Sequence, residues 1–306
     1  MRTLVVDLLG GLGDLVMVLP TVHALADADP GGELVVLTHA PGAVLLARDP
    51  AVTGVLTAEK HAEREIVGKA LADLAPDLVV STTRFDGIGD LIDADAAARG
   101  TRAVTNLWRS PPADELVGER YQRILAAEGV IADRVRPPRL VLGDDERAPE
   151  VAPGTVVLVP DAGMAVKRWP TPRWTQLAAA LHDRPVVSVT PLEGVEAWEP
   201  TDLRGLAARF AAVGRAGGTV VGGDTGPVRM AAASGARTIA LFGPTLAARY
   251  GLEEGENLQG LTGCPHRRPT AITEQVCWWD AGCPLSGSGP ACLEDLSVAS
   301  VVAAIG

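Results

Sequence analysis

Short runs of apolar, mostly β-branched residues alternate along this chain of 306 residues with longer stretches rich in alanine and leucine. The short runs are apolar throughout, which is typical of parallel strands that are covered by helices on both faces. Parallel strands need a long connection between them, usually a helix. The alternation therefore excludes all-helical and all-β folds and predicts an α/β protein.

The apolar runs predict four strands in each half of the chain. They lie at Thr3–Leu8, Leu34–Thr38, Asp77–Ser81, Ala103–Leu107, Thr155–Pro160, Pro185–Val189, Thr219–Gly222 and Thr238–Phe242. Helical patterns lie between them at Val22–Ala28, Glu119–Glu128, Trp174–His182 and Leu203–Arg215. Residues 135–154 hold four prolines and an acidic run, as domain linkers do. We expect two Rossmann-like domains, 1–150 and 151–306, with parallel sheets facing each other across a cleft.

The charge is unevenly divided between the two halves. Residues 1–150 hold 15 Lys and Arg against 24 Asp and Glu, whereas residues 151–306 hold 12 against 14, for a formal net charge of −11. Such an acidic chain lacks the basic surface of a nucleic-acid-binding protein. Since no apolar run approaches the roughly 18 residues of a membrane span, we expect a soluble, cytoplasmic protein. We read the N-terminus as a strand and not as a secretory signal.

The first predicted strand runs into Gly10-Gly11-Leu12-Gly13-Asp14 and then into an apolar helix. Ligands of open parallel sheets bind at such strand-to-helix turns. A dinucleotide site is disfavoured, because Val16 takes the place of the third glycine and the next strand ends without an acidic residue. Asp14 has two interpretations. It caps the helix N-terminus, or it acts as a general base towards a substrate hydroxyl.

The second half has a similar turn, Gly222-Gly223-Asp224-Thr225-Gly226-Pro227. Pro227 suits the start of a helix, and the backbone N–H groups of Thr225 and Gly226 would then form an anion site suited to phosphate. Lys167 follows another strand of this half and is one of only three lysines in the chain. A compact ammonium group suits a diphosphate, although a surface loop would also explain one lysine.

The motifs together resemble the ADP-heptose-type heptosyltransferases, a family of inverting glycosyltransferases with the GT-B fold, over nearly the whole chain. The resemblance rests on Leu12-Gly13-Asp14, Glu119-Arg120-Tyr121, Lys167-x-Trp169-Pro170, Asp224-Thr225-Gly226-Pro227 and Phe242-Gly243-Pro244-Thr245, in this order. It implies a nucleotide-diphosphate sugar, ADP-heptose, bound by the second domain and a hydroxyl acceptor bound by the first.

The same resemblance implies roles for individual residues. Asp14 matches the catalytic base, Lys167 the lysine that binds the donor phosphates, and Thr225 and Gly226 the backbone that surrounds them. The full predicted set adds Asp224, Pro227, Arg229 and Glu193 on the donor side, and Gly11, Gly13, Arg84 and Asp86 on the acceptor side or cleft. No metal cofactor is required if Lys167 and the helix terminus balance the charge of the leaving diphosphate.

Three positions depart from the family pattern. Leu8 stands six positions before Asp14, where the family usually has Arg or Lys, and Arg229 follows the Asp-Thr-Gly-Pro run, where a His is usual. The acid expected at the donor ribose has three candidates, Glu193, Glu196 and Glu199. These changes leave the reaction type in place but leave the sugar, the nucleotide base and the acceptor open.

All four cysteines lie close together in the sequence, at Cys264, Cys277, Cys283 and Cys292. Their spacing matches no common zinc motif. Four cysteines within such a short stretch still suggest a structural zinc site, since metal binding is favoured over disulfides in a reducing compartment. Packed or free thiols are the alternative.

The charge division also bears on the acceptor. Arg84, Asp86, Asp90 and the acids of 93–95 follow a predicted strand of the acidic half, and a field of this sign favours a neutral or cationic acceptor, such as a small amino-sugar natural product, over an anionic lipopolysaccharide. Acids that merely face solvent are the alternative. Two other functions fit the architecture, a nucleotide-sugar epimerase on a GT-B-like fold and a non-catalytic nucleotide-sugar-binding protein.

Overall fold

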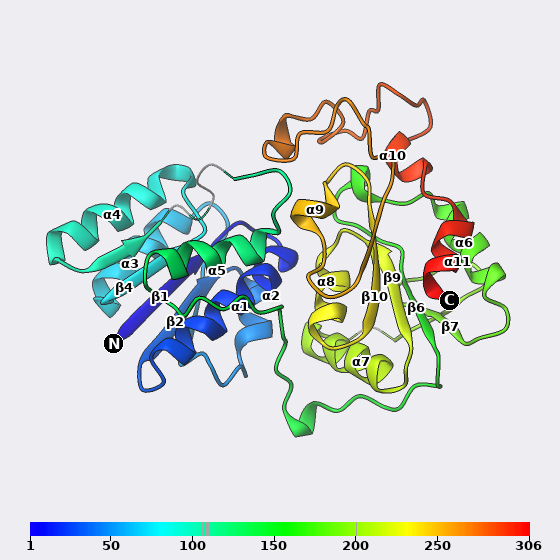
Figure 1. The fold of residues 1–306 in the computed structure, drawn as a ribbon. Helices are drawn as coiled ribbons and strands as arrows, with labels where there is room; N and C mark the ends of the chain where they lie inside the picture. Colours follow the sequence, from blue (N-terminus) through cyan, green and yellow to red (C-terminus); the bar gives the residue numbers. More distant parts are fainter. Residues whose placement is uncertain (106, 108–110, 200) are drawn as a thin grey trace. The chain divides into compact units, whose positions relative to one another are not determined.

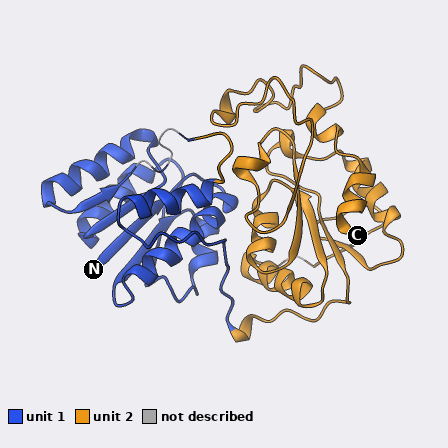
Figure 2. Ribbon diagram, viewed as in Figure 1, with its two compact units in different colours: residues 1–111, 117–143 blue, residues 112–116, 144–306 orange. Residues whose placement is uncertain are grey.

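The computed structural model describes residues 1–105, 107, 111–199 and 201–306, and its contacts divide the chain into two compact units. The first unit holds residues 1–111 and 117–143, and the second holds residues 112–116 and 144–306 (Figure 2). Each unit is an open parallel sheet with helices packed against it (Figure 1). The α/β class predicted from the alternating pattern is therefore confirmed.

The first unit has a five-stranded parallel sheet in the order β3-β2-β1-β4-β5. Its strands are β1 (Arg2–Asp7), β2 (Glu33–Thr38), β3 (Gly54–Thr57), β4 (Leu78–Ser81) and β5 (Arg102–Val104). Its helices are α1 (Leu12–Ala28), α2 (Ala40–Leu46), α3 (Glu63–Leu74), α4 (Ile88–Arg99) and α5 (Val117–Ala127), with a 3-10 turn at η1 (Phe85–Gly87). The predicted strand at Ala103–Leu107 ends earlier, at Val104, and its Asn106 lies outside the described residues.

The second unit has a six-stranded parallel sheet in the order β11-β10-β9-β6-β7-β8. Its strands are β6 (Val156–Val159), β7 (Val186–Ser188), β8 (Glu196–Ala197), β9 (Thr219–Gly223), β10 (Arg237–Phe242) and β11 (Glu256–Gln259). Its helices are α6 (Thr171–Ala180), α7 (Leu203–Arg215), α8 (Gly226–Ala233), α9 (Ala247–Tyr250), α10 (Ala291–Glu294) and α11 (Val298–Ile305). The 3-10 turns are η2 (Asp144–Glu146), η3 (Ala165–Lys167) and η4 (Ile272–Glu274).

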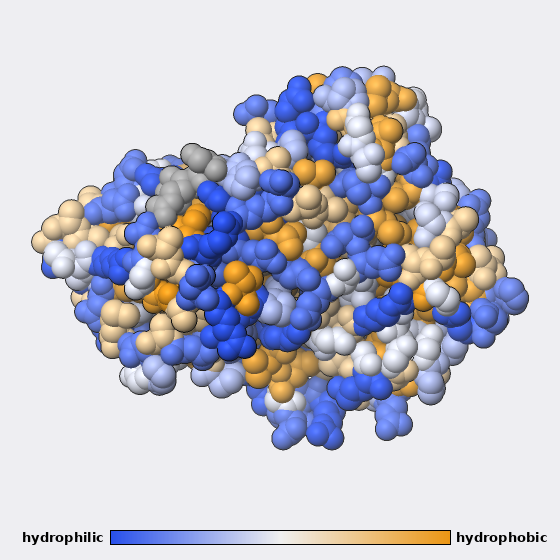
Figure 3. Space-filling model, in the orientation of Figure 1, coloured by the Kyte–Doolittle hydropathy of each residue, from blue (hydrophilic) through white to orange (hydrophobic). Residues whose placement is uncertain are grey.

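Each unit buries its own apolar core between sheet and helices. In the first unit, strand residues such as Leu4 and Val79 pack against Val67 and Ile92 of the covering helices. In the second unit, Trp169 and Trp174 meet edge to face, with ring centroids 4.9 Å apart, against the central strands. On the face shown in Figure 3, hydrophilic and hydrophobic residues are interspersed over the surface. Among the described residues, no helix combines the length and apolarity needed to cross a membrane.

Candidate active site

The turn between β1 and α1 places Asp14 in the first turn of the helix. Gly10 has φ +104°, which side-chain-bearing residues rarely adopt, and Gly11 is the helix N-cap. The Gly11 N–H donates to Asp14 Oδ2 over 3.0 Å, and a Cβ on Gly11 would lie only 2.6 Å from that oxygen. Asp14 thus does cap the helix, as one of its two interpretations predicts. The cap uses one carboxylate oxygen and is compatible with a second role.

Asp7 is the charged residue that ends β1, and the sequence analysis did not single it out. It is 2% exposed, and its Oδ1 accepts a hydrogen bond of 2.7 Å from Thr82 Oγ1. Burial, together with the negative charge of Asp14, raises the pKa of Asp7 to about 7, and the hydrogen bond from Thr82 only partly opposes this. Leu8, the departure noted from the family pattern, is itself buried beside it. An acid directly after an apolar strand was the signal that could have revealed Asp7.

Two of the predicted acceptor-side residues, Arg84 and Asp86, lie in the turn that follows β4, whereas Gly11 and Gly13 lie at the start of α1. Arg84 Nη2 contacts Asp90 over 3.2 Å and Asp93 over 3.9 Å, and its Nη1 donates to Thr105 Oγ1 over 3.3 Å. Asp86 is exposed, and its φ of +51° marks a tight turn. Arg84 therefore balances part of the acidic charge that the sequence places here.

In the second unit, the turn η3 after β6 carries Lys167. Its Nζ donates to Asp224 Oδ2 over 2.7 Å and lies 5.5 Å from the ring centroid of Trp278. A Cβ on Gly223 would lie 3.0 Å from the Lys167 carbonyl oxygen, so the glycine lets η3 approach the end of β9 closely. The lysine and the Asp-Thr-Gly-Pro motif are thus neighbours in space, although 57 residues separate Lys167 from Asp224.

Asp224 is the centre of a buried polar network. It is 7% exposed and also accepts hydrogen bonds from Arg229 Nη2 over 2.7 Å and Thr245 Oγ1 over 2.9 Å. Burial alone would raise the pKa of Asp224, but the charges of Lys167 and Arg229 and the hydrogen bonds they donate hold it well below its usual range. The carboxylate is therefore ionised at any physiological pH.

Arg229 lies inside the unit and not on its surface. It is 5% exposed, and its guanidinium also donates to the backbone carbonyls of Tyr250 and Gly251. Arg229 and Asp224 were both predicted on the donor side, and the structure brings their side chains into contact. That they bind the donor remains a prediction. Thr245, which belongs to the Phe-Gly-Pro-Thr motif of the resemblance, was missed as a member of this network.

Helix α8 begins directly at this network. Thr225 is the N-cap with an extended backbone, Gly226 is the first helical residue and Pro227 the second. Arg229 N donates the first helical bond to Thr225 O over 3.2 Å, so the N–H groups of the preceding residues lie outside the helical ladder. Among the described residues, the buried hydroxyl oxygen of Thr225 has no hydrogen-bond partner. This end of the helix suits an anion.

Glu193, predicted to contact the donor ribose, lies exposed in the turn between β7 and β8. Glu196 and Glu199 are exposed as well. Only Glu199 is distinguished, since its backbone carbonyl accepts from Arg209 Nη1 over 2.6 Å. Which of the three contacts a ribose remains a prediction.

The four cysteines are unpaired thiols. Burial raises the pKa of Cys292 to about 12 and also raises that of Cys277, so both stay protonated at neutral pH. Within the described residues, no three or more His, Cys, Asp or Glu side chains are placed to hold a metal ion. Cys264, Cys277 and Cys283 also contribute to the raised pKa of Cys292. The structural zinc site that the clustering suggested remains a prediction, with packed thiols as the alternative.

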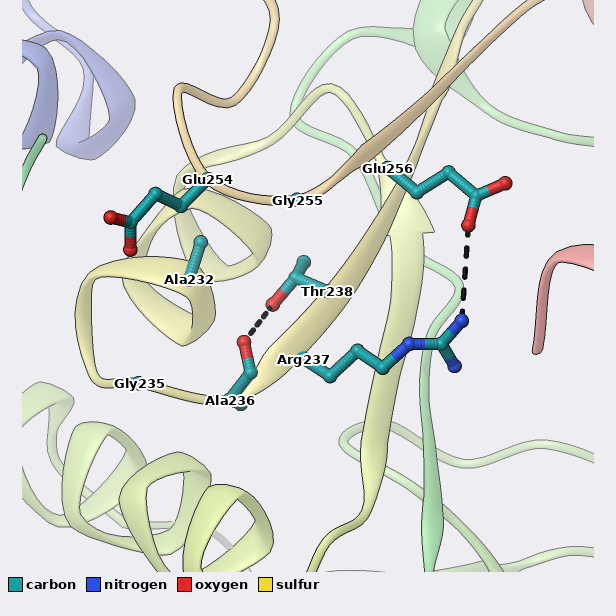
Figure 4. A pocket seen from close by; sticks show the side chains of 8 residues that line it. All are labelled: Ala232, Gly235, Ala236, Arg237, Thr238, Glu254, Gly255 and Glu256. Atoms are coloured by element: carbon teal, nitrogen blue, oxygen red, sulfur yellow. Dashed lines mark hydrogen bonds and ion pairs between the residues drawn. The ribbon is translucent and has the colours of Figure 1, made fainter. Parts of the chain in front are cut away.

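A hollow of about 460 Å³ in the second unit lies away from these residues (Figure 4). Residues at the starts of β10 and β11 line this hollow. The Arg237 guanidinium points toward the Glu256 carboxylate, with Nη2 and Oε2 3.8 Å apart. Lys167 and the N-terminus of α8 lie at the opposite, carboxyl edge of the same sheet. Because ligands of parallel sheets bind at the carboxyl edge, we assign the site to that edge and not to the hollow.

Comparison with known proteins agrees with the motifs. Residues 119–261, somewhat less than half of the chain, match the family model described as glycosyltransferase family 9 (heptosyltransferase). No curated protein gives a significant match.

Three solved structures share the fold over nearly their whole length. A family 9 glycosyltransferase from Veillonella parvula has 15% identity, covers 99% of this chain and 95% of its own, and gives a TM-score of 0.74. ADP-heptose LPS heptosyltransferase II of E. coli has 19% identity, with 100% and 97% covered and a TM-score of 0.71. E. coli heptosyltransferase WaaC with ADP-2-deoxy-2-fluoro heptose has 18% identity, with 99% and 98% covered and a TM-score of 0.69.

At these identities the solved structures establish the fold, which is GT-B, and the family model supports the activity class independently. The resemblance predicted from the motifs is thereby confirmed: residues 119–261 match the family 9 model, and the chain has the fold of the solved heptosyltransferases.

Proposed function

We propose that this enzyme transfers a sugar, with inversion, from a nucleotide-diphosphate donor to a hydroxyl acceptor, and that the donor is ADP-linked heptose. The observation that carries the proposal is the contact of Lys167 with the Asp-Thr-Gly-Pro turn at the start of α8. A cation and a helix N-terminus at one edge of a sheet are what a diphosphate requires. The resemblance to the heptosyltransferases supplies the identity of the sugar and the nucleotide.

In this proposal, Lys167 and the N–H groups of Thr225 and Gly226 bind the diphosphate. The unpartnered hydroxyl of Thr225 is available to a phosphate oxygen. Asp224 and Arg229 act behind them, because Asp224 holds the Lys167 ammonium and Arg229 holds Asp224. Pro227 fixes the start of the helix, and Glu193 is the proposed ribose contact.

The reaction is a single displacement. The acceptor oxygen forms a bond to the anomeric carbon while Asp14 takes the hydroxyl proton. The bond from that carbon to the diphosphate breaks, and the diphosphate leaves with the electron pair. Lys167 and the positive end of α8 stabilise the negative charge that develops on it. These groups suffice for the charge balance, so the proposal requires no metal cofactor.

We propose a neutral or cationic acceptor bound by the first unit, with Gly11 and Gly13 allowing close approach to the β1–α1 turn. The acidic residues after β4 support this choice of acceptor. Arg84 pairs with Asp90 and Asp93 and so reduces the negative charge there. An amino-sugar acceptor carries its charge as an ammonium group, which Asp86 on the exposed turn would attract.

Titration calorimetry with ADP tests the donor site. Lys167→Ala should weaken ADP binding about tenfold or more, because a hydrogen bond to a charged group contributes roughly 1.5–3 kcal/mol. Lys69→Ala is the matched control, since Lys69 is an exposed lysine on α3 that pairs with Asp73. Unchanged affinity in Lys167→Ala would remove this lysine from the donor site.

Turnover separates the transferase from the two other functions considered. A transferase releases free ADP from the sugar nucleotide when an acceptor is added. An epimerase would change the sugar without an acceptor, and a binding protein would do neither. ADP release that is independent of any acceptor, or an altered donor sugar, would refute the proposed transfer.

A further inference from the structure

The segment between β11 and α10, residues 260–290, carries three of the four cysteines and has no role in the proposed reaction. We call it the cysteine segment; Figure 1 draws it in orange. Arg267 ties it to the second sheet, because this arginine is 8% exposed and its Nη2 donates to the carbonyls of Gly243 and Gly260 over 2.8 Å each. These glycines directly follow β10 and β11, so the segment starts at the same carboxyl edge as the proposed donor site.

Trp278 is the residue of the cysteine segment that contacts the proposed donor site. It is 5% exposed, and its ring centroid lies 5.5 Å from Lys167 Nζ. Trp278 also packs in one apolar cluster with Cys277 and with Val166, the residue before Lys167 in η3. It therefore meets both the charged end of Lys167 and the turn that carries this lysine.

Hydrogen bonds within the segment hold the backbone of Trp278. Its N–H donates to Gln275 O over 3.0 Å. Gln275 is itself 3% exposed, and its side chain accepts from Arg268 N over 3.1 Å and donates to Ile272 O over 3.1 Å. The indole ring thus lies on a turn that the segment itself keeps in place.

The ring and a carboxylate hold the Lys167 ammonium together. An ammonium group is attracted by the negative face of an indole, and more strongly where water is excluded. Of the three N–H groups on Nζ, one is donated to Asp224 Oδ2 over 2.7 Å. The side chain of Lys167 is 21% exposed, so the ammonium keeps an open side on which a diphosphate can accept the remaining N–H groups.

We propose that Trp278 is a positioning residue for Lys167, and that with Asp224 it holds the ammonium where the diphosphate binds. The proposal rests on the proposed function of Lys167. A lysine that moves freely loses the freedom of its long side chain when a ligand binds, and this loss weakens binding. A lysine held by a ring and a carboxylate has lost that freedom before the donor arrives. Through Trp278, the cysteine segment is therefore part of the donor site.

Titration calorimetry with ADP in a double-mutant cycle tests this role. Trp278→Leu should weaken ADP binding about 2- to 30-fold, the range that cation–π attractions span from exposed to buried sites. Trp278→Phe keeps an aromatic face and should bind ADP more tightly than Trp278→Leu. In a protein that already carries Lys167→Ala, the change Trp278→Leu should have no further effect. Equal losses with and without Lys167 would mean that Trp278 acts through packing alone, and would overturn the proposal.

Trp279 provides the matched control. It is the next residue of the same segment, it is 75% exposed, and its Nε1 donates to Thr273 O over 3.2 Å. Trp279→Leu should leave ADP affinity as in the wild type. A loss as large as that of Trp278→Leu would overturn the assignment to Trp278.

NMR of the wild-type protein without substrate reports on the contact itself. Protons over an aromatic face resonate upfield, and with only three lysines in the chain the methylene next to the Lys167 ammonium can be assigned. We expect it upfield in the wild type and at its ordinary position in Trp278→Leu, with Lys60 and Lys69 unchanged. An ordinary position in the wild type overturns the contact.

The calorimetry also separates this proposal from the proposed donor site. Unchanged ADP affinity in Lys167→Ala would refute the role of Lys167 and, with it, the role of Trp278. Weakened binding in Lys167→Ala with unchanged binding in Trp278→Leu would refute the role of Trp278 alone.

Discussion

Each unit of the protein has a buried aspartate at the carboxyl end of a strand that leads into a helix, and the pKa values of the two are shifted in opposite directions. Asp7 is the last residue of β1 and accepts a hydrogen bond from one neutral donor, and burial together with the charge of Asp14 raises its pKa to about 7. Asp224 follows β9 with Lys167 and Arg229 beside it, and their charges keep its pKa below the usual range. Burial is common to both, so the neighbouring cations decide the charge.

The difference bears on the task that we propose for the second unit. A permanently ionised Asp224 keeps the Lys167 ammonium in place for a diphosphate, and no physiological change of pH releases it. The pKa of Asp7 instead lies near neutral pH, so its charge responds to changes of pH around 7. The same strand-to-helix turn thus gives a fixed anion in one unit and a titrating acid in the other.

Loss of the proposed base should have the largest effect. Asp14→Asn should lower turnover about 100- to 10,000-fold, which is the range of general acid–base catalysis, while ADP affinity stays as in the wild type. Measuring ADP release and calorimetric ADP binding on the same sample checks both statements. Turnover near the wild-type rate would mean that Asp14 only caps the helix. The β1–α1 turn would then have no catalytic role to compare with the donor site of the second unit.

Removing a cation from the buried network around Asp224 should lower the stability of the protein. Arg229→Met leaves Asp224 with one cation fewer and the carbonyls of Tyr250 and Gly251 without their donor. We expect the free energy of unfolding in urea to fall by about 3–5 kcal/mol, as for other broken buried ion pairs. Lys69→Met breaks an exposed pair and should change it by less than about 1 kcal/mol. Equal effects of the two variants would contradict the buried network.

The two acids should also make opposite contributions to stability as pH changes. Asp7 has a folded pKa above the unfolded value of 3.8, so its folded state binds more protons and stability is lost as pH rises from about 4 to about 7. Asp224 has a folded pKa below that value, so its contribution is present above pH 4 and is lost as pH falls below it.

The variant Asp7→Asn isolates the first contribution. It cannot ionise, so at pH 8 it should be more stable than the wild type by about 2–4 kcal/mol, and the gap should close toward pH 4. Urea unfolding at several pH values measures this gap. A constant difference between wild type and variant over this range would mean that Asp7 does not titrate in the folded protein.

The sequence predicts the central strands well because they are buried and apolar throughout. Thr3–Leu8 was expected where β1 spans Arg2–Asp7, and Leu203–Arg215 was expected and found as α7. The edge strands β3, β8 and β11 were missed, since β11 reads Glu-Asn-Leu-Gln and is set by pairing with β10 rather than by its own residues. Such strands carry no apolar pattern of their own.

The residues of the candidate site likewise fall into those that the sequence predicts and those that it does not. Asp14 and Lys167 lie in motifs that can be recognised one by one, and the sequence pointed to both. Asp7 ends an apolar run and was hidden in it, and the contact of Asp224 with Arg229 depends on where α8 begins. Thr82 and Thr245 contact Asp7 and Asp224 because the order of the strands in each sheet brings distant segments together. No local sequence pattern contains that order.

The charge difference between the two halves should give the smallest effect. If acids of the first unit attract a cationic acceptor, its KM should rise with added salt, because salt screens exposed charges beyond about 10 Å. We expect only a few-fold rise between low and physiological salt, because Arg84 already pairs with Asp90 and Asp93 and leaves Asp86 as the exposed acid of the turn. The measurement compares an aminocyclitol or amino sugar with a lipid that bears keto-deoxy-octulosonate. The Asp86→Asn variant should flatten the salt dependence for the amino acceptor, whereas the control Asp73→Asn on α3 should leave it intact. Efficient transfer to the anionic lipid, with a KM that falls as salt is added, would mean that the acidic charge of this half only faces solvent.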